Sequence, residues 1–106
     1  MALKLSDLAL QDLEDIRRYT VESWGRDQWL KYYQGMIATF ESIQTDPNRG
    51  RNRDLFYDGM LSRNYERHVI FYMAIEKAND DPVILRIVHQ RRNLPALVYY
   101  EDLDQS

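Results

Sequence analysis

Two stretches decide the fold: Arg67-His68-Val69-Ile70-Phe71-Tyr72-Met73-Ala74-Ile75 and Val83-Ile84-Leu85-Arg86-Ile87-Val88-His89. Both are dense in β-branched and aromatic residues, and residues 76–82 between them are rich in turn formers. This pattern predicts an antiparallel hairpin. In the second strand, strict alternation puts one set of side chains on one face, Val83, Leu85, Ile87 and His89, and leaves the other face to Ile84, Arg86 and Val88. Because both faces are largely apolar, we expect this strand in the middle of a sheet.

Two amphipathic helices are predicted before the hairpin. Ser6 is a favoured N-cap for the first, and Gly25 can adopt the left-handed conformation that closes it. The apolar stripe of the first helix recurs at spacings of three and four: Ala9, Leu13, Ile16, Thr20 and Ser23/Trp24. The second helix runs from about residue 27 to about residue 45, with the stripe Trp29, Tyr32/Tyr33, Met36, Phe40 and Ile43. Because only Gly25 separates the stripes, the helices fold back against each other.

Shorter elements complete the predicted order β-αα-βββ(-α). Residues 2–5 are an expected edge strand, residues 48–58 a polar connection, and Gly59 opens a strand over residues 60–65. A short helix is expected over residues 95–100, followed by a frayed tail at about 101–106. Gly35, within the second helix, marks either a close approach of the two helices or a tolerated defect. We expect one α+β domain over residues 1–106, with the helical hairpin packed on an antiparallel sheet.

Composition narrows the class of protein. A chain of 106 residues can bury a core without a metal or cofactor, and the lack of cysteine excludes a disulfide framework and Cys-based zinc sites. The first twenty residues carry seven charged side chains and no later run has transmembrane length, so we expect a cytoplasmic protein without membrane contact. Residues 49–92 hold nine basic and six acidic side chains, yet the net charge is -3. That balance argues against direct nucleic-acid binding.

Four groups of residues are candidates for chemistry or binding. The first is the pair His68 and His89, which is either a metal or acid/base pair or, as we favour, a pair of hydrogen-bonded structural histidines. The second group is a set of arginines near the sheet end, which either stabilise phosphate charge or form a solvated rim: Arg63, Arg67, Arg86, Arg91 and Arg92. The third is a set of aromatics that could bind a base or a protein, although we favour packing over the core: Phe56, Tyr57, Tyr99 and Tyr100. The fourth is the aromatics of the helix hairpin, which we expect to be mostly core, with a partner groove as the alternative: Trp24, Trp29, Tyr32 and Tyr33. The sequence has no Gly-rich phosphate loop, nucleophile elbow or His-Glu-x-x-His motif.

The chain resembles the ParE branch of the ParE/RelE toxin superfamily from about residue 3 to about residue 95. The motifs that carry the resemblance are Trp24-Gly25, Pro47-x-x-Gly50-Arg51, His68-Val69-Ile70-Phe71-Tyr72 and Arg86-Ile87-Val88-His89-x-Arg91. The resemblance implies the β-αα-βββ architecture with an optional last helix. It further implies the toxin of a type II toxin-antitoxin module that poisons DNA gyrase by binding, without catalysis, and is neutralised by a ParD-like antitoxin.

Two alternatives stay open within this resemblance. RelE-type relatives cleave mRNA on the ribosome, and the residues that would serve this activity here are Arg67, Arg86, Arg91 and Tyr99. The third possibility is a non-toxic relative that only binds an antitoxin, because Leu61, Met73 and Asn93 depart from the usual ParE pattern. The acidic balance and the single basic residue in the strand after Gly59, Arg63, favour the gyrase inhibitor.

Two binding surfaces are predicted for such a toxin. An antitoxin helix and a following extended segment would lie along the helical hairpin and the sheet edge, on Trp29, Tyr32, Tyr33, Phe56 and Tyr57. We expect Trp29 and Tyr33 to be partly exposed there. The target would bind the C-terminal part of the chain, which gathers cations and aromatics: His89, Arg91, Arg92, Tyr99 and Tyr100.

Overall fold

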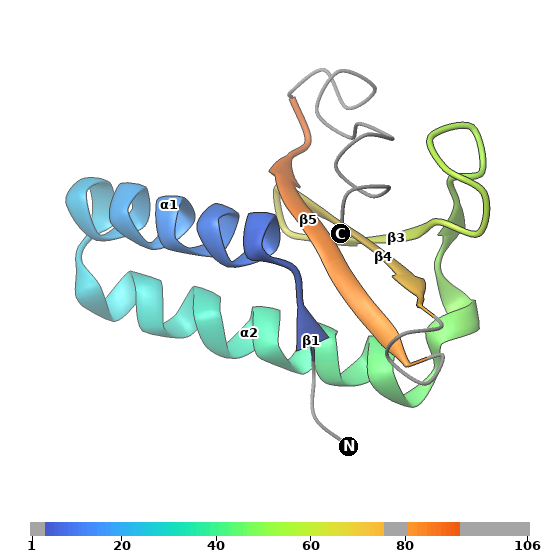
Figure 1. Cartoon of the computed structure of the whole chain (residues 1–106). Helices are drawn as coiled ribbons and strands as arrows, with labels where there is room; N and C mark the ends of the chain where they lie inside the picture. Colours follow the sequence, from blue (N-terminus) through green and yellow to red (C-terminus); the bar gives the residue numbers. More distant parts are fainter. Residues whose placement is uncertain (1–3, 76–80, 92–106) are drawn as a thin grey trace.

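A computed structural model describes residues 4–75 and 81–91 of the chain. A helical hairpin packs on one face of a five-stranded sheet with the strand order β1-β5-β4-β3-β2 (Figure 1), which confirms the predicted α+β architecture. The predicted last helix and frayed tail lie outside the described residues. The elements are β1 Lys4–Leu5, α1 Asp7–Trp24, α2 Arg26–Thr45, the 3-10 helix η1 Pro47–Arg49, β2 Arg51–Asn52, β3 Leu61–Tyr65, β4 His68–Ala74 and β5 Pro82–His89.

The central hairpin is confirmed, but the sheet is mixed rather than antiparallel. β4 and β5 pair antiparallel, with His68 opposite His89, and β3 pairs antiparallel with β4. β1 instead runs parallel to β5, where Lys4 lies opposite Val83. The parallel pairing follows from the chain path, because α1 and α2 intervene between β1 and the rest of the sheet. The two-residue strand β2, at the other edge, lies inside the segment predicted as a polar connection.

The predicted strict alternation along β5 is wrong, because the strand contains a β-bulge. The register shifts between Phe71 and Tyr72, which lie opposite Arg86 and Ile84, so Leu85 is the extra residue. Beyond the bulge the two faces exchange. Ile84 and Ile87 therefore share the helix-covered core, while Leu85 and Val88 belong to the cluster on the other face.

Helix α1 begins at the cap that the sequence predicts and then closes the free edge of β5. The Ser6 side chain accepts a hydrogen bond from the Ala9 amide at 3.0 Å and donates to the Leu85 carbonyl at 2.7 Å. One carboxylate oxygen of Asp12 accepts from the Ile87 amide at 2.9 Å and from Nε of Arg86 at 2.8 Å. These side-chain hydrogen bonds continue along the edge of β5 beyond the last residue of β1, so β5 is hydrogen-bonded on both of its edges.

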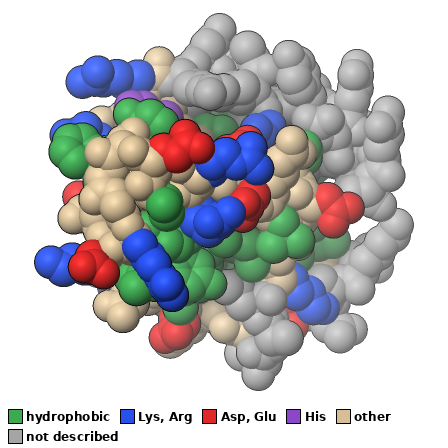
Figure 2. All heavy atoms as spheres, turned by 90° about the vertical axis from the view of Figure 1, so that its left-hand side faces the viewer, with side chains coloured by type: hydrophobic (Ala, Val, Ile, Leu, Met, Phe, Trp, Pro, Cys, Tyr) green, Lys and Arg blue, Asp and Glu red, His purple; other side chains and the backbone are tan. Residues whose placement is uncertain are grey.

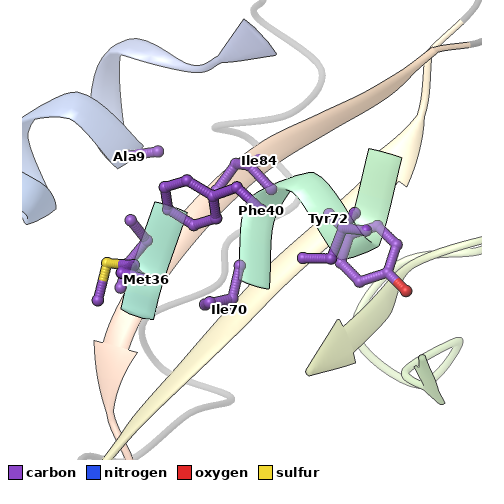
Figure 3. Packing of buried hydrophobic residues seen from close by; sticks show 8 residues of the cluster. Ala9, Met36, Phe40, Ile70, Tyr72 and Ile84 are labelled. Carbon is purple, nitrogen blue, oxygen red and sulfur yellow. The ribbon is translucent and has the colours of Figure 1, made fainter. Parts of the chain in front are cut away.

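The main core lies between the helices and the sheet. Phe40 of α2 sits among Ala9, Ile70 and Ile84, and the Tyr72 ring lies at one end of this cluster with its hydroxyl pointing away from it (Figure 3). That hydroxyl donates to the Pro47 carbonyl at 2.8 Å, so the large ring is buried without losing its hydrogen bond.

Gly35 marks a close approach, but the partner is the sheet rather than α1. A Cβ atom at this position would lie 2.7 Å from Cζ of Tyr65 in β3. The Tyr65 hydroxyl donates to the Tyr32 carbonyl at 2.9 Å, which fixes the ring against this turn of α2. Only a residue without a side chain leaves room for that contact.

Asp12→Asn should destabilise the fold by about 2–4 kcal/mol, because it removes the charge that pairs with a largely buried Arg86. Chemical denaturation at pH 7 measures the free energy of unfolding. The matched control is Asp15→Asn, one turn along α1 at an exposed position, which we expect to stay within about 0.5 kcal/mol of wild type. Equal effects of the two substitutions would contradict the role assigned to Asp12.

Candidate functional site

A groove of about 370 Å³ lies between α1 and α2 on the outer side of the hairpin. Its lining is mainly apolar, with one ion pair at the rim: Leu10, Leu13, Glu14, Arg17, Trp29, Leu30 and Tyr33. Leu10 is 52% exposed and Leu30 43% exposed, so apolar surface is open to a partner. A long apolar groove between two helices suits the apolar face of a third helix.

The walls of the groove are fixed by packing. Trp29 and Tyr33, one turn apart on α2, have ring centroids 5.2 Å apart, and only 8% of Trp29 is exposed. On α1, Arg17 donates two hydrogen bonds to the Glu14 carboxylate, and these bonds hold the pKa of Glu14 below its ordinary value. Both pairs are therefore already in contact in the free chain.

The five residues predicted to bind an antitoxin do not form one surface. Trp29 and Tyr33 line the groove, although the expectation that Trp29 is partly exposed is wrong, because its indole is buried in the groove floor. Tyr32 points inward to β3 and β4. Phe56 and Tyr57 pack against the cluster on the opposite face of the sheet. The groove residues Leu10 and Leu30 were not predicted, because each lies just off the regular apolar stripe of its helix.

A second candidate site is the aromatic cluster where α2 meets the ends of β4 and β5. The Tyr32 hydroxyl lies 2.5 Å from Nδ1 of His68, and the rings of His68 and His89 are 5.5 Å apart. Burial and the neighbouring His89 lower the pKa of His68 to about 4. Burial raises the pKa of Tyr32 to about 12. Both side chains are therefore neutral at pH 7, and the geometry is that of hydrogen-bonded structural groups.

This cluster is poorly suited to acid-base or metal chemistry. A general base works best with a pKa near the operating pH, and His68 is far below it. Nδ1 of His89 accepts a hydrogen bond from the Arg91 amide at 3.1 Å, which leaves its proton on Nε2. Within residues 4–75 and 81–91, no three His, Asp or Glu side chains are grouped so that they could hold a metal ion.

The arginines named as candidates have different surroundings. Arg86 is held by two hydrogen bonds to Asp12, and its side chain is 16% exposed. Arg67 and Arg91 are exposed, and the Arg67 carbonyl accepts from the Gln90 amide at 2.8 Å, so the two lie at the same end of the sheet as His89. Arg92, Tyr99 and Tyr100, also predicted to bind the target, lie outside the described residues.

Other basic side chains of the sheet are also held by the fold. Arg63 donates to the Asp46 carbonyl at 2.6 Å, at the C-terminal end of α2, where the helix dipole favours a cation. Arg53 donates to Ser62 at 2.8 Å, and its guanidinium lies 5.6 Å from the ring centroids of Phe56 and Phe71.

In the part of the chain that the structure describes, neither helix is long and apolar enough to span a bilayer.

A family model described as "ParE toxin of type II toxin-antitoxin system, parDE" matches residues 3–94. The chain is 31% identical over 93 residues to Toxin ParE1 of Caulobacter vibrioides, which covers 88% of this chain and 93% of that protein. Toxin ParE1 of Mycobacterium tuberculosis is 28% identical over 90 residues, 85% of this chain and 90% of that protein.

The fold is also found among solved structures. A chain from the structure titled "Chromosomal ParDE TA system from P. aeruginosa" matches with a TM-score of 0.69 at 24% sequence identity. The match covers 84% of this chain and 95% of that chain. The arrangement of hairpin and sheet is therefore shared over most of this chain and nearly all of that chain.

His68 makes the fold sensitive to acid. Above pH 6.5 the imidazole is neutral in both states; as the pH falls from 6.5 to about 4, the unfolded chain takes up a proton that the folded protein resists, so stability is lost. His68→Gln keeps an acceptor for Tyr32 and removes this titration. Between pH 7 and pH 4.5, we expect wild type to lose about 1–2 kcal/mol more of its free energy of unfolding than the variant, after allowance for partial exposure. Parallel stability curves for the two proteins would contradict this assignment.

Proposed function

The chain belongs to the ParE toxin family of type II toxin-antitoxin systems, and we propose that it inhibits DNA gyrase by binding and is held inactive by a ParD-like antitoxin. The observation that carries the proposal is a match to the toxin family over residues 3–94, which includes the helical hairpin and the whole described sheet. The geometry of the groove and of the arginines supports it.

The antitoxin is proposed to bind the groove of the helical hairpin. An amphipathic helix laid in the groove would cover Leu10 and Leu30 and pack against Trp29 and Tyr33. Glu14 and Arg17 at the rim offer one charge of each sign to polar residues of the partner. Because Leu10 and Leu30 are about half exposed in the free chain, covering each one contributes roughly 1 kcal/mol, about half the value for burying a whole leucine side chain.

Inhibition by binding is favoured over RNA cleavage. Cleavage needs cations free to stabilise a phosphate transition state and a base that accepts a proton near pH 7. Of the four residues that the nuclease alternative would use, Arg86 is engaged with Asp12. The nearby histidine, His68, has its pKa lowered to about 4. With Arg86 paired to Asp12 and His68 neutral at pH 7, the chain is better suited to bind a protein than to cleave an RNA backbone. Binding a protein needs no cofactor.

The target is proposed to bind the sheet end, through His89, Arg91, Arg92, Tyr99 and Tyr100. His89 is the last residue of β5 and Arg91 lies two residues further on, where its amide donates a hydrogen bond to the His89 ring. Arginine and tyrosine are among the residue types that most often contribute strongly to the binding energy of protein interfaces.

Two assays with purified protein test the proposed function. Inhibition of DNA supercoiling by gyrase, relieved by one equivalent of the antitoxin, is the expected result. Cleavage of mRNA in a translation extract without an effect on supercoiling would instead establish the ribonuclease. Activity in neither assay would indicate a relative that only binds antitoxin.

Leu30→Ser should weaken antitoxin binding at least tenfold while the melting temperature changes little, because the side chain is partly exposed in the free toxin. Isothermal titration calorimetry with the ParD-like antitoxin measures the affinity. Leu55→Ser is the matched control, since Leu55 is 91% exposed and lies on the connection between β2 and β3, away from the groove. An unchanged affinity of the Leu30 variant would place the antitoxin elsewhere.

Replacing Arg91 and Arg92 together by alanine should relieve growth inhibition by the induced toxin, because the target loses two cations of its proposed binding surface. Antitoxin affinity should stay within threefold of wild type. Lys31→Ala, an exposed cation on α2 that does not line the groove, controls for the loss of positive charge alone. Full growth inhibition by the double variant would refute the sheet end as the target surface.

A further inference from the structure

The surface at the Gly25 end of the helical hairpin is mixed in character. This end extends beyond the sheet (Figure 1), and Trp24, the last residue of α1, is 70% exposed there. The prediction that Trp24 is mostly core is therefore wrong, because α1 continues past the sheet. Figure 2 looks onto this end and shows hydrophobic side chains among charges of both signs. A surface with both signs of charge does not select one kind of ligand.

The other end of α2 leads to a different surface, where two arginines lie on one face of the sheet. Arg51 is in β2, and the Arg53 amide extends the pairing of β2 with β3 by donating to the Met60 carbonyl at 2.8 Å. Residues two apart in an extended strand point to the same side. Because the Arg53 guanidinium contacts Phe56 and Phe71, which belong to the cluster on the opposite face from the helices, both arginines lie on that face.

The fold holds the Arg53 guanidinium in place but uses only part of it. Its Nε donates to Oγ of Ser62 at 2.8 Å, and Ser62 is only 2% exposed. The rings of Phe56 and Phe71 support the guanidinium, with both centroids 5.6 Å from its carbon. The bond at Nε does not use the end of the fork that is formed by Nη1 and Nη2. That end can donate two parallel hydrogen bonds to another group.

Within residues 4–75 and 81–91, neither arginine has an acidic partner. Neither forms an ion pair there, and the Arg53 side chain has no hydrogen bond besides the one to Ser62. Burial and the charge of Arg51 lower the pKa of Arg53, although a guanidinium stays protonated at pH 7. A partly buried cation beside a second cation is unfavourable. A bound anion would remove this cost.

We propose that Arg51 and Arg53 form a binding site for a carboxylate of a protein partner. The Nη end of Arg53 matches the two oxygens of a carboxylate, and Arg51 supplies a second positive charge. The Phe56 ring, which is partly exposed beside Arg53, offers apolar surface to the residues next to that carboxylate. Neither arginine lines the groove between α1 and α2, so the site goes beyond the proposed antitoxin groove.

A nucleic-acid backbone suits this site less well than a single carboxylate. Its phosphates follow one another along the chain, and each phosphate contact requires a cation. The connection that carries Arg53 also carries Asp54 and Asp58, both exposed. Hydrogen bonds from Asn52 and Gly59 lower the pKa of Asp54, so its carboxylate is ionised at pH 7. A row of phosphates would meet these negative charges, whereas one carboxylate needs only the two arginines.

The test is an NMR titration of the whole protein with a capped tripeptide that has one glutamate between two leucines. We expect the Nε–H resonance of Arg53 to shift and saturate, and the affinity to fall at least fivefold when glutamine replaces the glutamate of the peptide. Arg51→Gln changes an exposed side chain and should weaken binding at least threefold without a change in melting temperature. Arg53→Lys keeps the charge but loses the fork, and it should weaken binding at least fivefold.

The matched control is Arg26→Ala, which removes an exposed cation at the first residue of α2, the end of that helix far from β2. It should change the affinity for the glutamate peptide less than 1.5-fold. Equal affinities for the glutamate and glutamine peptides, or equal effects of Arg51→Gln and Arg26→Ala, would overturn the site. A single-stranded RNA oligonucleotide that shifts the same resonance at lower concentrations than the peptide would assign the site to phosphate and overturn the carboxylate.

This titration needs neither antitoxin nor gyrase, so its result is independent of the proposed function. The source of the carboxylate is identified by measuring antitoxin affinity and inhibition of gyrase supercoiling with Arg51→Gln. A loss of at least threefold in antitoxin affinity assigns the carboxylate to the antitoxin, and the same loss in gyrase inhibition alone assigns it to the target. Unchanged values in both assays would refute a protein partner for this site.

Discussion

The structure depends on β5 being paired on both of its edges. β4 supplies one full ladder, but β1 is only two residues long, so most of the other edge would present open amides and carbonyls. Ser6 and Asp12 close it with side-chain hydrogen bonds to Leu85 and Ile87. Helix α1 is thereby placed along β5 and α2 beside it, and the groove between them has its position because of this edge. A chain that failed to close the edge would lose both the sheet and the groove.

The closure of the edge also decides what the arginines do. Arg86, next to the bulge at Leu85, pairs with Asp12 of α1, and the ion pair compensates for the burial of both charges. Arg63 and Arg53 are held by the end of α2 and by two phenylalanine rings. The fold therefore holds three of the nine basic residues that the sequence concentrates in residues 49–92, while Arg49 and Arg51 are exposed. Exposed cations remain at the sheet end, at Arg67 and Arg91, where they can meet a protein surface.

The sequence predicts the elements better than it predicts which side chains are exposed. The hairpin of β4 and β5, the Ser6 cap and the Gly25 reversal follow from local patterns, and the structure has them where they were expected. The bulge, the parallel pairing of β1 and the contact of Gly35 with Tyr65 depend on residues far apart in the chain, which periodicity does not reveal. The exposure of the residues at the candidate site is predicted least well. Trp29 and Trp24 look alike in the sequence, yet one forms the floor of the groove and the other stands in solvent.

The difference in exposure between Trp29 and Trp24 comes from the length of α1 relative to the sheet. An amphipathic stripe buries only where a second element lies beneath it, and α1 continues past the end of the sheet. The same helix therefore contributes to a core near Ala9, a groove wall near Leu10 and Arg17, and open surface at Trp24. One continuous helix can in this way connect the stable part of the protein to the part that meets partners. Because the buried half fixes the helix, the exposed half is held in place before any partner arrives, and binding there need not order the chain.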